Sequence, residues 1–280
     1  MNIKTFIQRH PVATYFIMAF IISWLGTFLM VAPEIVRGEA IPHLAGLLMF
    51  PVLLIGPSLT GLTLTGIADG RSGLRDLFSR MGRWHVDVRW YAALLIPPVL
   101  ILAVLLTLRS LVSPVFTPHL FPLGILFGLV PGFFEEIGWM GYAFPKMRLT
   151  RSALSASLLL GVLWGLWHTP VVDYLGAASP HGMSWLPFFL AFVAAVMAMR
   201  VLIVWIYSHT SSVLLAQLMH ASFTGSLVMF GPSSISPGQE ALWYAVYAAT
   251  LWIAAVLVIT RYGKHLARPQ HIQPLQPAAE

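Results

Sequence analysis

Two adjacent carboxylates lie inside one of the most apolar stretches of the sequence. Glu135 and Glu136 occur in the segment PGFFEEIGWMGY, and they are the only charged residues between positions 121 and 145. An acid facing lipid at the centre of a span costs about 2.5–3.5 kcal/mol, so we expect both side chains to face a protein interior or a water-filled cavity. Neighbouring helical residues point about 100° apart. One acid is therefore predicted to act at the centre of a site, and the other to support it.

Two histidines in other apolar segments could complete such a site. His168 has Trp164 one turn before it, and His220 has Thr224 one turn after it, each pair on one helix face. A single histidine in a membrane segment is as often a packing residue as a functional one. A glutamate and two histidines from three segments could instead converge on a water molecule, a metal ion or a proton path.

The composition indicates a membrane-embedded protein. The chain has 280 residues, of which 58% are hydrophobic and 9% are charged, and its mean hydropathy is +0.80. A soluble domain carries about 25% charged residues. The chain has no cysteine, which excludes disulfides and thiolate chemistry. The net charge of +6 does not indicate nucleic-acid binding, because the basic residues lie between apolar runs rather than on one face.

Apolar runs of about 20 residues predict an all-α, polytopic bundle of about eight transmembrane helices. The expected spans are residues 12–32, 44–68, 90–112, 121–144, 153–171, 185–207, 211–230 and 241–261. The first is expected to be a retained span, because it is longer than a usual signal core and no small-x-small cleavage site follows it. Residues 1–261 are thus predicted to form a single transmembrane domain. Residues 262–280, rich in Pro, Gln and His, are predicted to form a flexible polar tail.

The basic residues predict that both termini lie in the cytoplasm. With eight spans, fourteen of the 16 Lys and Arg residues fall on one side, Arg200 among them, and only Arg37 and Arg109 fall on the other. On the basic side, residues 69–89 place apolar side chains at helical spacing between arginines. This segment is expected to be either an amphipathic surface helix or a basic loop.

Glycines at a spacing of four predict close helix packing. Gly124 and Gly128 occur in the fourth span, and Gly161 and Gly165 in the fifth. Such spacing lets two helices approach closely, which we expect to bring Glu135 and His168 together.

The motifs EEIGWMGY, WGLWH and HASFT, in this order on successive apolar segments, resemble those of the CPBP family of intramembrane proteases. This family contains the Rce1-type CAAX prenyl endopeptidases and many bacterial Abi-type proteins. Its motifs are Glu-Glu-x-x-x-Arg, Phe-x-x-x-His and His-x-x-x-Asn. The resemblance covers roughly residues 45–230, a protease-like core. It implies an eight-helix bundle with a conical intramembrane cavity that opens to the cytoplasm or laterally to lipid.

The resemblance also implies a role for each site residue. Glu135 would be the general base that activates a water molecule, and Glu136 would support it. His168 would help to hold that water. His220 would help to stabilise the oxyanion, with Thr224 at the position of the family's Asn. Glu135, His168 and His220 would also suit zinc. The resemblance favours a metal-independent glutamate mechanism, so no cofactor is assigned.

Three positions depart from the family pattern: Trp164 replaces Phe, Met140 replaces Arg and Thr224 replaces Asn. These changes leave the expected fold intact and bear on catalytic competence. The leading hypothesis is an intramembrane endopeptidase that cleaves a peptide near the cytoplasmic membrane face. One alternative is a catalytically impaired member that binds a membrane peptide or partner protein. Another is a transporter or proton relay, although the sequence shows neither an inverted repeat nor a continuous polar path.

The expected surroundings and partners follow from this hypothesis. The chain is expected to be a multi-pass protein of the bacterial inner membrane, in contact with lipids and with a peptide or protein substrate, prenylated or unprenylated. A peptide pheromone, a bacteriocin-type precursor and a membrane protein are equally compatible substrates. No nucleic-acid partner is expected, and no oligomeric state is predicted.

Overall fold

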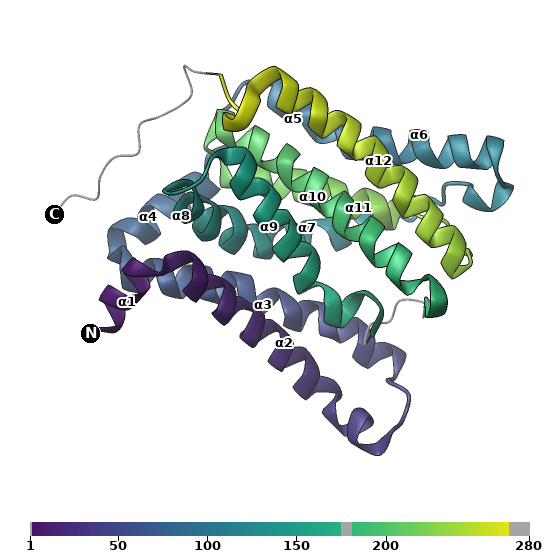
Figure 1. The fold of residues 1–280 in the computed structure, drawn as a ribbon, viewed down its shortest axis with the longest axis horizontal. Helices are drawn as coiled ribbons and strands as arrows, with labels where there is room; N and C mark the ends of the chain where they lie inside the picture. Colours follow the sequence, from purple (N-terminus) through teal and green to yellow (C-terminus); the bar gives the residue numbers. More distant parts are fainter. Residues whose placement is uncertain (1, 175–180, 269–280) are drawn as a thin grey trace.

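The computed structural model describes residues 2–174 and 181–268, which form an all-α bundle with no β-strand among them (Figure 1). The longer helices are α2 (Pro11–Arg37), α3 (His43–Ala68), α6 (Ile96–Leu111), α7 (Gly124–Gly138), α9 (Ala153–Trp167), α10 (Trp185–Thr210), α11 (Val213–Phe230) and α12 (Pro237–Tyr262). The shorter ones are α1 (Ile3–Arg9), α4 (Gly70–Met81), α5 (Arg89–Ala92) and α8 (Phe144–Arg148). The predicted fold class, a polytopic helical membrane bundle, is confirmed.

Six helical segments of the described chain are long and apolar enough to cross a membrane. They are Pro11–Arg37, Leu44–Ala68, Arg89–Leu111, Gly182–Thr210, Val213–Phe230 and Pro237–His265. The other two expected spans differ from a simple long helix. The fourth is interrupted after Gly138, and the fifth ends at Trp167, after 15 residues. A multi-pass protein is thus supported, whereas the count of eight crossings stays a prediction.

The fourth span changes its helical geometry directly after the two acids. α7 passes into a π-helical turn, η3 (Trp139–Ala143), which continues into α8. A π-turn accommodates an extra residue and is frequent at functional sites. The turn is braced from outside, because Arg80 on α4 donates to the carbonyl oxygen of Gly141 at 3.0 Å and to the hydroxyl of Tyr207 at 2.9 Å.

α4 resolves the two readings of residues 69–89 in favour of a helix. Its buried residue, Leu77, lies against Gly141 of the π-turn, while Phe78 on the other side is exposed. Burial lowers the pKa of Arg80, but Tyr207 and the carboxylate of Asp76 outweigh burial and raise that pKa above its usual value. The Arg80 brace therefore keeps its charge.

Glycines set the distance between α7 and α11. A Cβ atom at Gly128 would lie 2.2 Å from the carbonyl oxygen of Ala221 on α11, which leaves no room for a side chain. Gly161 on α9 faces α10 instead, where an added Cβ would lie 2.8 Å from the Cα of Met197. The glycines of the fourth and fifth spans therefore do not pack against each other as expected. The glycines of α7 instead let α7 pack closely against α11, the helix that carries His220.

Serine caps begin the two helices that carry the candidate histidines. Ser152 accepts a hydrogen bond from the backbone N–H of Ser155 at 3.1 Å at the start of α9. Ser212 does the same for Leu215 at 3.1 Å at the start of α11. Each cap satisfies an N–H group that has no partner within its helix.

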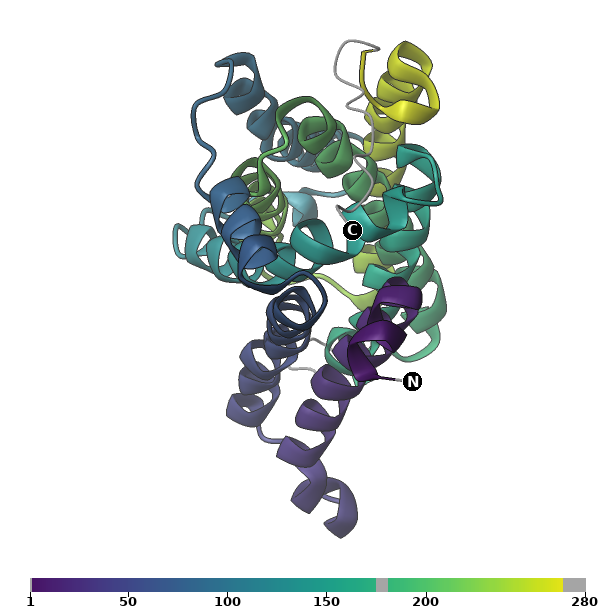
Figure 2. The ribbon, with the colours of Figure 1, turned by 90° about the vertical axis from the view of Figure 1, so that its left-hand side faces the viewer.

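α1 and the end of α12 lie at the same end of the bundle as α4 and α8 (Figure 1). This arrangement agrees with the predicted even number of spans. Seen from that end, α2 and α3 run as a pair along one side of the other helices (Figure 2). Within the predicted tail, residues 262–268 are described: Tyr262 ends α12, and the residues after it include a short 3-10 turn and the buried Leu266. Residues 269–280 of the tail lie outside the described residues.

Candidate active site

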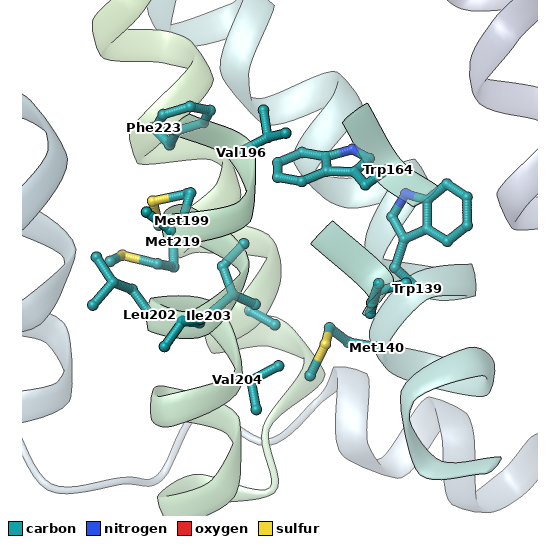
Figure 3. Close-up of a cluster of buried hydrophobic side chains, with 14 of the residues drawn as sticks. Trp139, Met140, Trp164, Val196, Met199, Leu202, Ile203, Val204, Met219 and Phe223 are labelled. Atoms are coloured by element: carbon teal, nitrogen blue, oxygen red, sulfur yellow. The ribbon is translucent and has the colours of Figure 1, made fainter. Parts of the chain in front are cut away.

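Glu135 is held at the end of α7 by two indole groups. Its Oε2 atom accepts hydrogen bonds from Nε1 of Trp164 at 2.7 Å and from Nε1 of Trp139 at 3.2 Å. The side chain is buried, with the residue 2% exposed. Figure 3 shows the two indole rings beside each other. Oε1 receives no hydrogen bond from any described residue. One oxygen is therefore fixed by the protein, and the other is left to bind a further group.

Glu136 points into a different environment, as expected for its neighbour on a helix. Its Oε2 atom accepts a hydrogen bond from Nη1 of Arg200 at 2.7 Å, and its Oε1 atom accepts one from Nδ1 of His220 at 2.8 Å. All three residues are at most 1% exposed. A buried charge must be paired and hydrogen-bonded to be tolerated. Both oxygens of Glu136 are thus occupied, which suits a supporting role.

Arg200 is the site residue that sequence reasoning missed. Its predicted place among the basic residues of the cytoplasmic side is wrong, because Arg200 is fully buried inside the bundle. It lies ten residues before the end of α10 at Thr210, which is about 15 Å along the helix. The available signal was a single arginine well inside the predicted span 185–207. An intramembrane cation is as informative as an intramembrane acid.

The position of Arg200 accounts for one departure from the family pattern. Met140, at the position of the expected arginine, is fully buried and belongs to the same hydrophobic cluster as Ile203 and Val204 (Figure 3). The cation that contacts Glu136 comes from α10 instead of the helix that carries the two glutamates. The sequence motif therefore lacks its arginine, but the folded protein places another arginine, Arg200, beside the second glutamate.

Trp164 is the residue that joins the site together. Besides its hydrogen bond to Glu135, its ring lies 4.8 Å from that of His220 and 5.7 Å from that of His168, edge to face in both cases. The guanidinium carbon of Arg200 lies 4.3 Å from the centre of the ring, a cation–π contact. A phenylalanine at this position could keep the ring contacts but could not donate to Glu135.

His168 lies at the C-terminal end of α9, just before Pro170. Its Nδ1 atom lies 2.7 Å from the carbonyl oxygen of Trp164. Because a carbonyl oxygen can only accept, Nδ1 carries the proton, and Nε2 is the acceptor in a neutral ring. The ring is half-buried and packs edge to face on Trp167 at 4.8 Å and on Phe192 at 5.3 Å. His168 therefore offers a fixed lone pair.

The structure brings four of the five predicted site residues into one network: Glu135, Glu136, His168 and His220. Thr224 lies one helical turn beyond His220 and is half-buried. Its hydroxyl makes no hydrogen bond to another described residue. The role of Thr224 stays a prediction.

The residues present do not fit a zinc ion. Among residues 2–174 and 181–268, no three His, Asp or Glu side chains form a cluster that could hold a metal. Glu135, His168 and His220 meet around the ring of Trp164, which lies against both histidines and donates to the glutamate. No reaction step is therefore derived through a metal ion.

The site is enclosed by its own helices. Two cavities of the described part of the chain have no site residue in their lining; one, of about 480 Å³, lies at the other end of the bundle beside His119 and Trp243. Glu135, Glu136 and His220 are almost completely buried. Access of a peptide to Glu135 therefore requires helices to separate.

Comparison with known proteins supports the resemblance inferred from the motifs. Residues 117–226, which include every site residue above, match the family described as type II CAAX prenyl endopeptidase Rce1-like. A CAAX prenyl protease 2 of Methanococcus maripaludis is 30% identical over 149 residues, which are 45% of this chain and 51% of the relative. The chain thus spans about half the length of the curated relative that it matches.

Proposed function

We propose that this chain, a member of the Rce1-like family of CAAX prenyl endopeptidases, hydrolyses a peptide bond inside the membrane with Glu135 as the general base. The observation that carries the proposal is the asymmetry of the Glu135 carboxylate. Two indole N–H groups fix Oε2, and Oε1 is left to bind and deprotonate a water molecule. Glu136 cannot take this role without giving up its ion pair with Arg200.

The first chemical step is attack by water. A water molecule donates one hydrogen bond to Oε1 of Glu135 and the other to Nε2 of His168. Glu135 takes a proton as the water oxygen bonds to the carbonyl carbon of the substrate, and the carbonyl oxygen becomes an oxyanion. Glu135 then passes the proton to the amide nitrogen, and the C–N bond breaks to release an amine and a carboxylic acid. General base catalysis of this kind contributes about 10²–10⁴-fold to a rate.

The second requirement is a donor for the oxyanion. Nδ1 of His220 bonds to Glu136, which fixes the ring and balances the charge of a protonated imidazole. Nε2–H of that ring is then free to donate to the oxyanion, with the hydroxyl of Thr224 as a second donor one turn away. Loss of one such donor costs about 10²–10³-fold in kcat in a well-studied protease. Arg200 acts through Glu136 and is a positioning residue.

We infer that the substrate is a membrane-associated peptide or protein. The matched relative is named as a CAAX prenyl protease, which makes a prenylated C-terminal peptide the first substrate class to test. An unprenylated membrane peptide fits the same buried, lipid-surrounded site. Nothing in the proposed chemistry requires the prenyl group, since it acts only on the peptide bond.

The test is a cleavage assay in liposomes with fluorogenic peptides in prenylated and unprenylated forms. Wild type, Glu135→Gln and His220→Ala are compared, with Glu39→Gln as a matched control, because Glu39 is exposed just after α2 and pairs there with Arg37. We expect cleavage by wild type and Glu39→Gln, loss of about a hundredfold or more in the other two, and no effect of a chelator. Cleavage by Glu135→Gln at the wild-type rate would show that the base is wrongly assigned. Peptide binding without cleavage by wild type would identify the non-catalytic alternative.

We further propose that the chain lies in the bacterial inner membrane with both termini in the cytoplasm. Without Arg200, thirteen Lys and Arg residues remain on the predicted cytoplasmic side, against two on the other. Because the chain has no cysteine, single cysteines report topology without a background. A cysteine at Ser72 on α4 should react with an impermeant maleimide only after cells are permeabilised. Labelling of this cysteine in intact cells would show that α4 lies outside the cell and that the proposed orientation is the wrong way round.

A further inference from the structure

A small pocket lies between helix ends on the side of the bundle that carries α4 and α8. Its volume is about 120 Å³. Six residues line it: Arg89, Trp90, Trp205, His209, Tyr262 and Arg268. They come from the start of α5, the end of α10 and the end of α12 with the residues that follow. We call it the interfacial pocket.

Four rings form the wall of the interfacial pocket. Trp90 lies 5.1 Å from Trp205 and 4.7 Å from His209, and His209 lies 5.0 Å from Tyr262. Nε1 of Trp205 is a buried donor with no partner among the described residues. Trp and Tyr gather at the level of the lipid headgroups, because their rings have an apolar body and a polar edge. The wall therefore marks this depth as the membrane–water interface.

Two arginines lie at the mouth of the interfacial pocket. Arg89 and Arg268 are both exposed, and the guanidinium of Arg89 lies 5.3 Å from the ring centre of Trp90. Asp87 opposes them in part, since it pairs with Arg89 at 3.2 Å. That pair is more than half exposed on both sides, so it is weak and easily exchanged for another anion. The pocket thus presents two cations against one acid.

The size and chemistry of the interfacial pocket match a phosphate group. Its volume equals that of about four water molecules, at roughly 30 Å³ each in the liquid. Arginine binds phosphate oxygens through two parallel N–H groups, which suits the two arginines at the mouth of the pocket. Exposed apolar side chains lie near the pocket at Leu95, in the 3-10 turn directly before α6, and at Leu257 on α12. These surfaces suit the acyl chains of a lipid and offer nothing to a free phosphate ion.

We propose that the interfacial pocket binds the phosphate of an anionic phospholipid headgroup, with Arg89 and Arg268 as its ligands. This inference is independent of the proposed peptidase activity, because none of the six residues belongs to the candidate active site. Free inorganic phosphate offers the same chemical group without the acyl chains, so the test must separate the two sources.

The test is native mass spectrometry of the full chain in detergent with phosphatidylglycerol or phosphatidylcholine. We expect wild type to retain one phosphatidylglycerol molecule in preference to phosphatidylcholine. Each of Arg89→Gln and Arg268→Gln should weaken retention about fivefold, the factor for roughly 1 kcal/mol per basic residue. Asp87→Asn should strengthen it by releasing Arg89. Arg71→Gln removes an exposed charge from α4 and should change nothing.

Three outcomes would overturn the proposal. Equal retention of the two lipids would show that the pocket does not distinguish an anionic headgroup from a zwitterionic one. An equal loss in Arg71→Gln and Arg268→Gln would show that net charge, and not this pocket, attracts the lipid. Displacement of the lipid by millimolar inorganic phosphate would assign the pocket to a soluble phosphate. All variants alter exposed side chains, so equal melting temperatures are expected and serve as the folding control.

Discussion

Arg200 on α10 donates to Glu136 on α7 at 2.7 Å, and both side chains are completely buried. The two residues are joined only by folding, since they lie 64 positions apart in the chain. The pair fixes Glu136, which in turn holds His220 at 2.8 Å. A cation that the motif lacks at position 140 is thus supplied by another helix. This relationship can be tested by exchanging the residues at positions 140 and 200.

Arg200→Met should destabilise the protein and abolish cleavage. It leaves the Glu136 carboxylate buried without its cation, and breaking a buried pair in this way costs about 3–5 kcal/mol. Thermal unfolding in detergent measures the loss. Arg109→Met is the control, because Arg109 is exposed at the end of α6.

The double variant Arg200→Met/Met140→Arg returns the cation to the position that it has in the family motif. We expect it to recover part of the lost stability and activity, since Met140 is buried in the same cluster as residues of α10. An Arg200→Met protein as stable and active as wild type would show that the ion pair does not support the site.

Trp164→Phe restores the family's residue and should nevertheless slow cleavage. It removes the 2.7 Å hydrogen bond to Glu135 and keeps the ring. A hydrogen bond to a charged group contributes about 1.5–3 kcal/mol, so we expect kcat to fall roughly 10- to 150-fold with little change in KM. Trp252→Phe is the matched control, because its indole donates at 3.0 Å to a carbonyl oxygen away from the site. Equal rates for the two variants would remove Trp164 from the proposed site.

Gly128→Ala should separate α7 from α11. The new methyl group would lie 2.2 Å from a backbone oxygen, and backbone cannot give way as a flexible side chain can. We expect a lower melting temperature and a loss of cleavage, because the distance from Glu136 to His220 depends on this contact. Gly66→Ala, where the nearest atom is a leucine methyl at 3.7 Å, should be tolerated. A wild-type rate in Gly128→Ala would mean that the site does not depend on this helix contact.

Thr224→Val tests the hydroxyl at the third departure from the family pattern. Valine keeps the shape and removes the donor, so we expect kcat to fall about tenfold or more if the hydroxyl contacts the oxyanion. Thr224→Asn should give a rate equal to or above that of wild type, because the amide group of asparagine reaches further than the threonine hydroxyl. If Val and Asn variants both match wild type, Thr224 has no part in the reaction.

Local sequence patterns were enough to find the fold class and the residues within each motif. Glu135, His168 and His220 were identifiable because polar side chains are rare in apolar spans. The pairing of helices could not be predicted, because glycines such as Gly128 and Gly161 carry no information about which neighbouring helix they face. Arg200 was missed because it was grouped with the basic residues of the cytoplasmic loops, although it lies inside the predicted span 185–207, where a cation is as informative as an acid. The π-turn after Gly138 also has no simple sequence signal, since it depends on contacts such as Arg80 with Gly141.

The separation between Glu136 and Arg200 also bears on how the protein is made. Synthesis proceeds from the N-terminus, so the helix with two acids leaves the ribosome before its cation exists. At about 5–20 residues per second, synthesis over the 64 positions from Glu136 to Arg200 takes roughly 3–13 s. During that interval Glu136 must be neutral, hydrated or shielded by the insertion machinery, because Arg200, the cation that pairs with it in the folded protein, has not yet been made. The entry of α10 is therefore the step at which this protein can first hold a charged glutamate in its interior.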